Sequence, residues 1–555
     1  MRLIERFGSL TVASALANRS TSDPGRDYIR YRDEVVSFGD VDSDAEALAA
    51  ALAHLGVDPG DRIALMLPPR PEFVVSMFAA AKLGAAIVPL NPRLTSNELQ
   101  YMLRHSGAVC AVTIEQWNGV DYLQLFETLM PQLPDLQHLV TVGEEELWYD
   151  DRIFQFEDLV SSGAGRDFPP ADVDASKDCF AVVYTSGTMG KPKGVELSHT
   201  NLLSVAAGTA DVLGIASSDR VIGVSALFHV FGLGPGLLSS VLAGASLILQ
   251  DEIGAAATLA DVERHEATIH YGIPTLFVAE LDELEARPRD VSSLRLAVVS
   301  GAPVNEDLVD RMSSRLDVLV STAYSLTETS STVSVSTPGD PEGKRRFTVG
   351  RPLPGTSVRI VGPDGGELPA ENVGELPVEG VGELPVQGVG ELPVESVGEI
   401  RVKGPGVMLG YLRQPRETAV AFDEEGYFRT GDLGLIDEEG YLHLVGRRKD
   451  VIIRSGFNVY PREVEAHIES HPAVQEVAAV GVADPLLGEA ICACIVPVEG
   501  AIVTDQEIVE WCRETLADDK IPDLVRFLDA LPRTDTGQVR RADLSRVVTA
   551  EGQSA

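Results

Sequence analysis

The sequence predicts an α/β protein: a large N-terminal domain of layered α/β subdomains plus a small β subdomain, followed by a small α+β C-terminal domain. Up to about residue 320, segments with helical apolar spacing alternate with short apolar segments typical of buried strands. From about residue 350 the predicted strands are short and lie between Gly and Asp turns. Helical spacing returns near residue 462.

The alternation of helix and strand starts near the N-terminus. Residues 44–56 have helical apolar spacing, Pro-Gly-Asp at 59–61 predicts a turn, and residues 62–67 are typical of a strand. Residues 72–84 predict a second helix and residues 85–89 a second strand. Because this order recurs, we expect a sheet with helices on both faces.

We place the boundary between the two domains at Lys449. Residues 1–448 then form the N-terminal domain, with the β subdomain at about 350–446, and residues 449–555 form the C-terminal domain. The C-terminal domain is expected to contain a helix near 462–470, strands near 474–497 and a helix near 506–516.

An eight-residue unit repeats inside the β subdomain. The copies are VGELPVEG at 373–380, VGELPVQG at 381–388, VGELPVES at 389–396 and VGEIRVKG at 397–404, with a degenerate copy at 365–372. Proline removes a donor from a strand ladder, and so few copies do not make a solenoid. We therefore expect a duplicated surface insert at about 365–404.

Composition and charge exclude several classes of protein. The chain has 45 Lys and Arg against 84 Asp and Glu, a formal net charge of −39, whereas non-specific nucleic-acid binding needs many cationic contacts. The five cysteines show no metal-ligand spacing, so we expect reduced core residues. The first residues lack a signal peptide and no apolar segment reaches membrane-spanning length, which predicts a cytoplasmic protein.

A segment suited to polyphosphate follows the apolar strand predicted at 180–183. Residues 184–194 (YTSGTMGKPKG) combine hydroxyls, glycines and lysines. Glycines let the backbone approach phosphate oxygens, hydroxyls and N–H groups ligate them, and lysine supplies positive charge. The spacing is not that of a Walker A loop. We interpret the segment as a phosphate-binding loop, with a surface turn as the alternative.

This loop resembles the phosphate loop of the adenylate-forming superfamily, which includes acyl-CoA synthetases, luciferases and nonribosomal-peptide adenylation domains. Further segments match the superfamily's motifs in order: FHVFG at 228–232, GAP at 301–303, AYSLTE at 323–328, TGD at 430–432 and GRRKD at 446–450. The resemblance covers nearly the whole chain except the repeats. It implies an acyl-CoA ligase that uses ATP or AMP, CoA and Mg²⁺.

The resemblance also implies a role for each matched residue. Tyr324 would stack on adenine, Thr327 would contact the α-phosphate and Glu328 would hold Mg²⁺, an ion that needs only one or two protein oxygens. Asp432 would accept both ribose hydroxyls, with Arg447 adding a contact, although an aspartate in a β-turn is the alternative. The other candidates for binding phosphate or AMP are Thr185, Ser186, Gly187, Thr188, Lys193, Gly301, Ala302 and Pro303.

Two further matches concern movement of the C-terminal domain. Lys449 is similar to the hinge about which the family's small domain rotates between two half-reactions. Residues 451–461 (VIIRSGFNVYP) are similar to the loop that lines the pantetheine tunnel after rotation. The candidates for this CoA tunnel are Arg454, Ser455, Gly456 and Phe457.

His229, in the FHVFG segment, matches the histidine that lines the family's acyl pocket. A lone histidine between apolar residues is equally consistent with core packing, and we do not interpret it as a general base. Gly232, Gly234 and Gly236 follow it, and their small size favours room for a bulky acyl group. We expect a hydrophobic carboxylic acid of medium or large size as the substrate.

The chain departs from the family at Gln538. Residues 531–541 (LPRTDTGQVRR) align with the motif Pro-x-Thr-x-x-Gly-Lys, so Gln538 takes the place of the catalytic lysine that bridges substrate carboxylate and α-phosphate. Glutamine donates a hydrogen bond but carries no charge. Losing one transition-state donor costs about 3–4 kcal/mol, on the order of 10² to 10³ in rate. Met189, where the family has a hydroxyl residue, removes a further phosphate ligand.

The second half-reaction does not need the missing lysine. We therefore predict that the protein takes a preformed acyl-adenylate, made by a separate adenylating enzyme, and transfers the acyl group to CoA. The alternatives are a complete two-step synthetase, in which Arg533, Arg540 or Arg541 restores the charge, and a nonenzymatic protein that binds acyl-adenylate. A carrier protein in place of CoA also stays open, because the pantetheine arm is the same.

Overall fold

The computed structural model describes most of the chain. It describes residue 3 and residues 10–145, 147, 150–185, 192–224, 226–251, 254–302, 304, 306–362, 365–370, 397–454, 457–484, 487–513, 516, 520–534 and 537–552. In this part of the chain, every helix is too short or too polar to cross a membrane.

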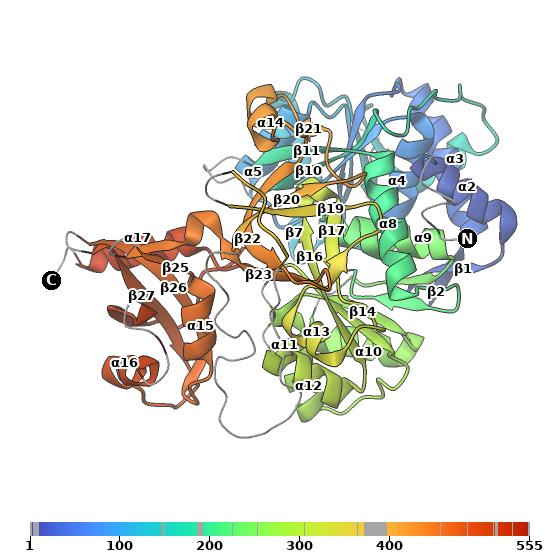
Figure 1. The fold of residues 1–555 in the computed structure, drawn as a ribbon. Helices are drawn as coiled ribbons and strands as arrows, with labels where there is room; N and C mark the ends of the chain where they lie inside the picture. Colours follow the sequence, from blue (N-terminus) through green and yellow to red (C-terminus); the bar gives the residue numbers. More distant parts are fainter. Residues whose placement is uncertain are drawn as a thin grey trace.

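Two large mixed sheets form the N-terminal domain (Figure 1). The first has the strand order β18 (Arg351–Pro352), β17 (Ser331–Val335), β16 (Leu319–Leu326), β15 (Leu296–Val299), β14 (Ile269–Gly272), β12 (Arg220–Ile222), β13 (Ser246–Leu249), β1 (Asp27–Tyr31) and β2 (Glu34–Ser37). The second has the order β21 (Gly410–Tyr411), β11 (Lys193–Ser198), β10 (Cys179–Thr185), β4 (Ala86–Pro89), β3 (Arg62–Met66), β5 (Cys110–Ile114), β8 (His138–Val142) and β9 (Ile153–Gln155).

The inner strands of both sheets pair in parallel, and antiparallel pairs lie toward their edges. Parallel strands need crossover connections, and the helices supply them. The helices of the N-terminal domain up to the β subdomain are α2 (Val12–Ser22), α3 (Phe38–His54), α4 (Pro71–Leu83), α5 (Ser96–Ser106), α6 (Tyr122–Leu129), α7 (Phe156–Gly163), α8 (His199–Leu213), α9 (Ser239–Ala243), α10 (Ala255–His265), α11 (Pro274–Ala286), α12 (Glu306–Leu316) and α13 (Glu342–Phe347). The predicted fold class is confirmed.

The helix predicted at 44–56 begins earlier than expected, at Phe38. Ser37 caps it: the Ser37 hydroxyl accepts a hydrogen bond from the Asp40 N–H (3.1 Å), and the Asp40 carboxylate accepts one from the Ser37 N–H (3.1 Å). This capping box satisfies two backbone donors at the helix start. The apolar spacing that predicted the helix becomes regular only after this first turn.

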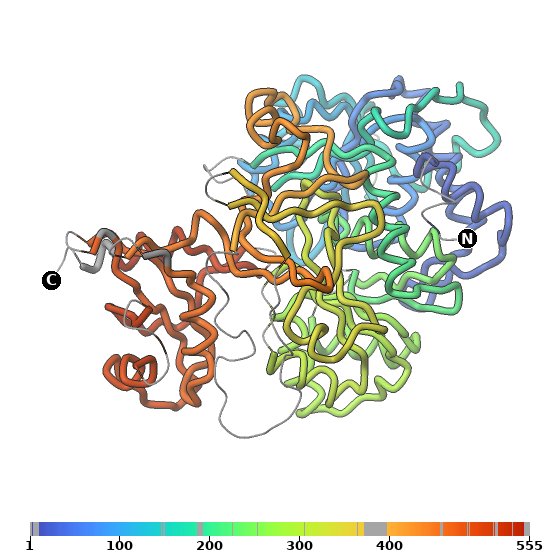
Figure 2. The backbone as a smooth tube through the Cα atoms, in the orientation of Figure 1, coloured from blue at the N-terminus to red at the C-terminus, as the bar shows by residue number. Residues whose placement is uncertain are grey.

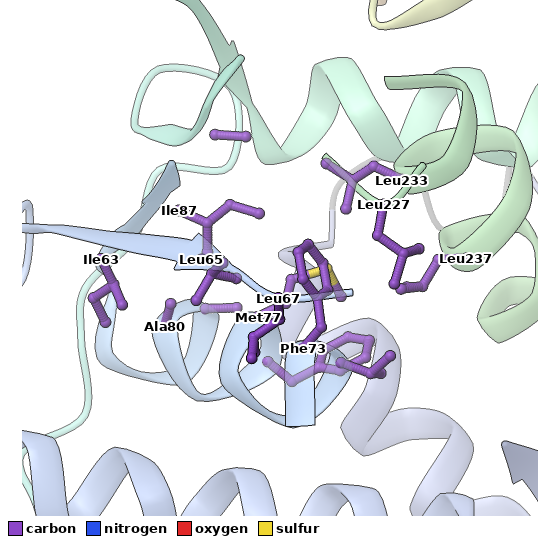
Figure 3. Packing of buried hydrophobic residues seen from close by; sticks show 14 of the residues in the cluster. Ile63, Leu65, Leu67, Phe73, Met77, Ala80, Ile87, Leu227, Leu233 and Leu237 are labelled. Atoms are coloured by element: carbon purple, nitrogen blue, oxygen red, sulfur yellow. The ribbon is translucent and has the colours of Figure 1, made fainter. Parts of the chain in front are cut away.

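One hydrophobic core joins the two sheets. Figure 3 shows how side chains far apart in the sequence meet in it. The labelled residues are Ile63, Leu65, Leu67 and Ile87 from the second sheet and its connections, Phe73, Met77 and Ala80 from α4, and Leu227, Leu233 and Leu237 from the segment before α9. Because these side chains are closely packed, the core fixes the positions of the strands that contribute to it.

The β subdomain is an antiparallel sheet of β19 (Ser357–Val361), β20 (Gly398–Lys403), β22 (Phe428–Ile436) and β23 (Leu442–Arg447), and α14 (Pro415–Ala421) lies between β21 and β22 in the chain. Residues 371–396, which hold most of the repeats, lie outside the described residues. The last repeat unit differs from the surface insert that was expected, because it supplies β20 between β19 and β22. It has no proline, and Ile400 and Val402 are buried.

The C-terminal domain has its own sheet and lies to one side of the N-terminal domain (Figure 2). Its elements are β24 (Ile452–Arg454), β25 (Phe457–Val459), α15 (Pro461–Glu469), β26 (Val474–Asp484), β27 (Gly488–Pro497), α16 (Asp505–Arg513), β28 (Leu524–Phe527) and α17 (Arg541–Gly552). They follow the predicted order. Cys492 and Cys494 on β27 and Cys512 on α16 are buried thiols, as expected of core residues.

Candidate nucleotide and acyl site

The predicted nucleotide residues meet where the large sheets, the β subdomain and the C-terminal domain come together. Tyr324 on β16 donates from its hydroxyl to Asp432 Oδ2 on β22 (2.6 Å), and Arg447 Nε on β23 lies 3.2 Å from Asp432 Oδ1. Asp432 and Arg447 are cross-strand partners in the β22–β23 ladder. The fold thus unites three residues that the sequence assigned to adenine and ribose.

Burial and the neighbouring arginine have opposite effects on the pKa of Asp432 in this cluster. Burial raises the pKa of Asp432 above its usual value, while Arg447 acts in the opposite direction. Burial also raises the pKa of Tyr324, and the Asp432 carboxylate adds to the effect, so the phenol is a donor at neutral pH. Asp432 Oδ2 accepts from Tyr324 and Oδ1 faces Arg447, and carboxylate oxygens are acceptors of the kind that the two hydroxyls of a ribose need.

Glu328 lies in the short 3₁₀ helix Thr327–Thr329 that follows β16. Its Oε1 accepts a hydrogen bond from the Tyr411 hydroxyl (2.9 Å), and Lys193 Nζ lies 4.5 Å from the centre of the Tyr411 ring. Thr327 is buried beside it. The sequence reasoning missed Tyr411, because one tyrosine after a glycine carries no chemical signal until the fold places it against Glu328.

The phosphate loop connects β10 and β11. Thr185 and Lys193 pair across the end of this hairpin. Ser186, Gly187, Thr188 and Met189 lie outside the described residues. A loop that closes an antiparallel hairpin beside Glu328 fits a role in binding phosphate, which stays a prediction.

The segment after β15 approaches the C-terminal domain. The Ser300 hydroxyl donates to the Ala323 carbonyl (2.9 Å), and Gly301 adopts φ 90°, a conformation that favours glycine. The Gly301 carbonyl accepts a hydrogen bond from Gln538 Nε2 (2.9 Å). Ala302 follows at partial exposure, and Pro303 lies outside the described residues.

The turn that carries Gln538 docks on the N-terminal domain. Thr534 braces it: the Gln538 N–H donates to the Thr534 hydroxyl (3.1 Å), and the Thr534 N–H donates to the Gln538 carbonyl (2.8 Å). Gly537, at φ 83°, lies so close to the start of α11 that an added Cβ would be 3.2 Å from Ile273 Cδ1. The C-terminal motif therefore faces the nucleotide residues.

The neighbouring arginines have partners within the C-terminal domain. Arg533 pairs with Glu476 (2.8 Å) and also donates to the Gly537 carbonyl. Arg541 pairs with Glu465 and donates to the Ala479 carbonyl (2.7 Å). The third cation considered from the sequence, Arg540, is exposed.

His229 lies just before an unusual helix. Its side chain is half-buried, and burial lowers its pKa to about 4, so the imidazole is neutral at pH 7. The π-helix η2 (Gly232–Leu238) follows, with Pro235 inside it. Proline removes one backbone donor, and π-helices are often found at functional sites.

The glycines of η2 do not leave open space, contrary to expectation. A Cβ added at Gly232 would lie 2.4 Å from the Ala226 carbonyl oxygen, and one at Gly236 would lie 2.5 Å from Val224 Cγ1. These glycines are small because protein atoms pack directly against them. They give no indication of the size of the acyl group.

The hinge candidate lies two residues after Arg447, and the tunnel candidate Arg454 is bonded within the C-terminal domain. Lys449 is exposed in the turn Arg448–Asp450 between β23 and β24. Arg454 makes a paired hydrogen bond to Asp523 (2.9 and 2.6 Å) within the C-terminal domain. Ser455 and Gly456 lie outside the described residues, and Phe457 begins β25. Their roles stay predictions.

Glu328 is the metal candidate that the site offers. In the described part of the chain, no group of three or more His, Cys, Asp and Glu side chains could hold a metal ion. Mg²⁺ is commonly bound through one or two carboxylates plus substrate phosphates, rather than by a cage of protein ligands. A single oriented carboxylate beside a phosphate loop fits this ion.

Comparison with known proteins matches most of the chain. Residues 16–385 match the AMP-binding enzyme family, and residues 463–538 match the AMP-binding enzyme C-terminal domain. The chain is 31% identical to the putative acyl-CoA synthetase YngI of Bacillus subtilis, over 96% of each chain. It is 32% identical to a feruloyl-CoA synthase of Amycolatopsis sp, over 95% of this chain and 97% of the other.

Solved structures share the whole architecture. The structure is similar to that of the anthranilate CoA ligase AuaEII in complex with anthranoyl-AMP, with a TM-score of 0.86 and 26% identity over 100% of both chains. It is also similar to ATP-bound MatB from Rhodopseudomonas palustris, with a TM-score of 0.83 and 29% identity over 97% of this chain and 99% of the other.

Proposed function

Since this chain belongs to the AMP-binding enzyme family, among its acyl-CoA synthetases, we propose that its reaction is the transfer of an acyl group from an acyl-adenylate to CoA. Formation of the acyl-adenylate from ATP is proposed to be slow or absent. A separate adenylating enzyme would then supply the acyl-adenylate. The observation that carries this proposal is the position and the neutrality of Gln538.

The side-chain amide of Gln538 donates a hydrogen bond to the Gly301 carbonyl, in the segment after β15 (2.9 Å). From the same position, a lysine would bring a positive charge toward the substrate carboxylate and the α-phosphate. An amide cannot offset the negative charge that gathers there as pyrophosphate leaves. Losing one such donor lowers the rate by on the order of 10² to 10³.

The arginines nearby favour the same conclusion. Arg533 and Arg541 are held by Glu476 and Glu465, so using either as a substitute cation would break an ion pair. Breaking one costs free energy that the reaction would have to supply. These pairs support weak adenylation.

Thioester formation needs groups that the chain retains. We propose that Tyr324 holds adenine, Asp432 and Arg447 hold ribose, and Thr327 with the phosphate hairpin holds phosphate, with Mg²⁺ on Glu328. After rotation at Lys449, the sulfur of CoA bonds to the acyl carbonyl carbon. The bond from that carbon to the phosphate oxygen breaks, AMP leaves with the electron pair, and the thiol proton passes to solvent.

The acid is proposed to be hydrophobic and of medium or large size. Two similar proteins carry the names feruloyl-CoA synthase and anthranilate CoA ligase, which favours an acid with a ring. The neutral His229 beside the π-helix is proposed to line this acyl pocket, where an uncharged imidazole suits an apolar substrate.

A complete two-step synthetase is the second candidate, because similar proteins are named as synthetases and CoA ligases. One experiment separates the two. The purified protein is given a panel of acids with Mg·ATP and CoA, and in parallel the matching acyl-adenylates with CoA, and products are identified by mass spectrometry. Acyl-CoA from the adenylates alone supports the proposal, and equal yields from both mixtures would overturn it. No acyl-CoA from either mixture would favour a nonenzymatic acyl-adenylate binder.

A further inference from the structure

A short segment ties the metal candidate to the phosphate hairpin. This bridging segment (Met408–Leu412) contains β21, which lies beside β11 (Figure 1). At one end the Met408 N–H donates to the Glu328 carbonyl (2.9 Å), and at the other the Leu412 N–H donates to the Gly194 carbonyl (2.8 Å). Its backbone is therefore fixed to both parts of the site.

Tyr411 belongs to the bridging segment, and its side chain also contacts both Glu328 and Lys193. The hydroxyl donates to Glu328 Oε1 (2.9 Å), and the ring face lies under Lys193 Nζ, 4.5 Å from the ring centre. The tyrosine is buried, and its N–H donates to the Thr418 hydroxyl (2.9 Å). The ring has little freedom to turn.

The direction of the Tyr411 hydrogen bond is fixed. The Tyr411 hydroxyl lies 2.9 Å from Glu328 Oε1, and an ionised carboxylate oxygen can only accept a hydrogen bond. A protonated phenol beside a carboxylate is the donor. A carboxylate held through one oxygen keeps its orientation, which leaves the second oxygen to ligate a metal ion.

We propose that Tyr411 is a positioning residue that orients Glu328 for Mg²⁺ through its hydroxyl and holds Lys193 at the base of the phosphate hairpin through its ring. The inference rests on the proposed function, which assigns the metal role to Glu328. Partners that orient a metal ligand typically change metal affinity by about 10- to 100-fold. A cation over an aromatic face is attracted to it, so the ring and the hydroxyl act on different groups.

The test measures metal binding directly. Tyr411→Phe removes the hydroxyl and keeps the ring under Lys193. Mn²⁺, which prefers the same oxygen ligands as Mg²⁺, is titrated into the full-length protein with a non-hydrolysable ATP analogue, and bound metal is followed by electron paramagnetic resonance. Mn²⁺ is expected to bind about 10-fold more weakly to Tyr411→Phe than to the parent. The affinity for the analogue without metal is expected to be unchanged.

Tyr427→Phe is the matched control. Its hydroxyl lies 3.0 Å from the Ser357 hydroxyl, and the Arg359 guanidinium lies 4.0 Å from its ring centre, so the chemistry is similar but remote from Glu328. This variant should bind Mn²⁺ as the parent does. Tyr411→Leu, which also removes the ring, should weaken binding of the analogue without metal.

Glu328→Gln distinguishes the positioning role of Tyr411 from the proposed metal role of Glu328. If Glu328→Gln weakens Mn²⁺ binding while Tyr411→Phe leaves it unchanged, the inference fails and the proposed metal role stands. If Glu328→Gln also binds Mn²⁺ like the parent, the proposed role of Glu328 fails, and the inference fails with it. If Tyr411→Leu matches Tyr411→Phe in every measurement, the part assigned to the ring is wrong.

Discussion

Gln538 is the residue on which the proposed division of the two-step reaction rests. Its amide is neutral and donates to the Gly301 carbonyl, in a turn braced by Thr534. The sequence predicted the missing charge, and the structure adds that Arg533 and Arg541 are held in ion pairs of their own. Rescue by Arg533 or Arg541 would therefore require one of these ion pairs to break.

Restoring the lysine should restore adenylation. Gln538→Lys is expected to raise the rate of acyl-adenylate formation by on the order of 10² to 10³, because a cation then faces the developing charge. The rate is measured as pyrophosphate release from Mg·ATP and the acid. Gln538→Ala is the control: without a charge it should gain nothing, yet it should still convert acyl-adenylate and CoA to product. No gain in Gln538→Lys would show that Gln538 is not the missing group.

At the scale of secondary-structure elements, glycine affects how closely other atoms pack, and proline affects which backbone hydrogen bonds form. In η2 the glycines allow protein atoms to approach directly, while Pro235 interrupts regular helical hydrogen bonding. In the β subdomain, the repeat unit without proline is the one that becomes the inner strand β20. Because it has no proline, this unit can donate from every backbone N–H of the strand.

The packing of η2 predicts a steric cost. Gly236→Ala places a Cβ 2.5 Å from Val224 Cγ1, and overpacking of this kind costs about 1–3 kcal/mol. The midpoint of thermal unfolding should fall by several degrees in differential scanning calorimetry. Gly25→Ala, where an added Cβ meets nothing within 4 Å, should leave the midpoint close to that of the parent. Equal midpoints for both variants would refute the packing argument.

The β subdomain contains an ion-pair cluster that predicts a dependence on pH. Burial acts to raise the pKa of Asp423, but the Tyr427 N–H and the guanidinium groups of Arg359 and Arg401 outweigh it and lower that pKa to about 2. A lowered pKa stabilises the fold above the ordinary aspartate value. That contribution is lost as the pH falls from about 4 to about 2.

Asp423→Asn removes this contribution. At pH 7 the variant should be less stable by about 2.5 kcal/mol, from a pKa difference of just under about two units at about 1.4 kcal/mol per unit. The difference from the parent should shrink as the pH falls from 4 toward 2, as followed by thermal unfolding at each pH. A difference that stays constant over this range would exclude the charge on Asp423 as its cause.

At the scale of the whole molecule, the proposed reaction depends on how the two domains are arranged. In this arrangement Gln538 and Gly537 dock on the N-terminal domain, while Arg454 bonds to Asp523 within the C-terminal domain. Bringing the tunnel loop to an acyl-adenylate requires the C-terminal domain to turn. The turn Arg448–Asp450 holds the proposed hinge, and its Arg448 and Lys449 are exposed.

Restricting the backbone of this turn should slow acyl-CoA formation but leave the affinity for AMP unchanged. Lys449→Pro fixes φ near −65° and restricts the residue before it, so rotation is hindered. Acyl-CoA formation from acyl-adenylate should fall by at least about 10-fold, as one misplaced catalytic element commonly costs that much or more. Affinity for AMP, measured by calorimetry, should not change. Arg448→Ala, at the exposed neighbour, should retain activity, and an active Lys449→Pro would rule out the hinge.

The sequence by itself determined the fold class, the order of the elements and the nucleotide motifs, because these depend on residues close together in the chain. Helical spacing, turn residues and the YTSGTMGKPKG loop can be recognised locally. The start of α3 was not predicted, and the residues of β20 were expected as a short strand at the end of a surface insert rather than as an inner strand, since capping and sheet pairing compete with apolar spacing.

Only the tertiary structure decided which distant residues meet. Tyr411 touches Glu328, Tyr324 touches Asp432, and the arginines near Gln538 are paired across the C-terminal domain. The packing of η2, which excludes its glycines as a source of pocket space, belongs to the same class. The physical reason is that hydrogen bonds and close contacts depend on distances of a few ångströms, and packing of the whole chain sets those distances.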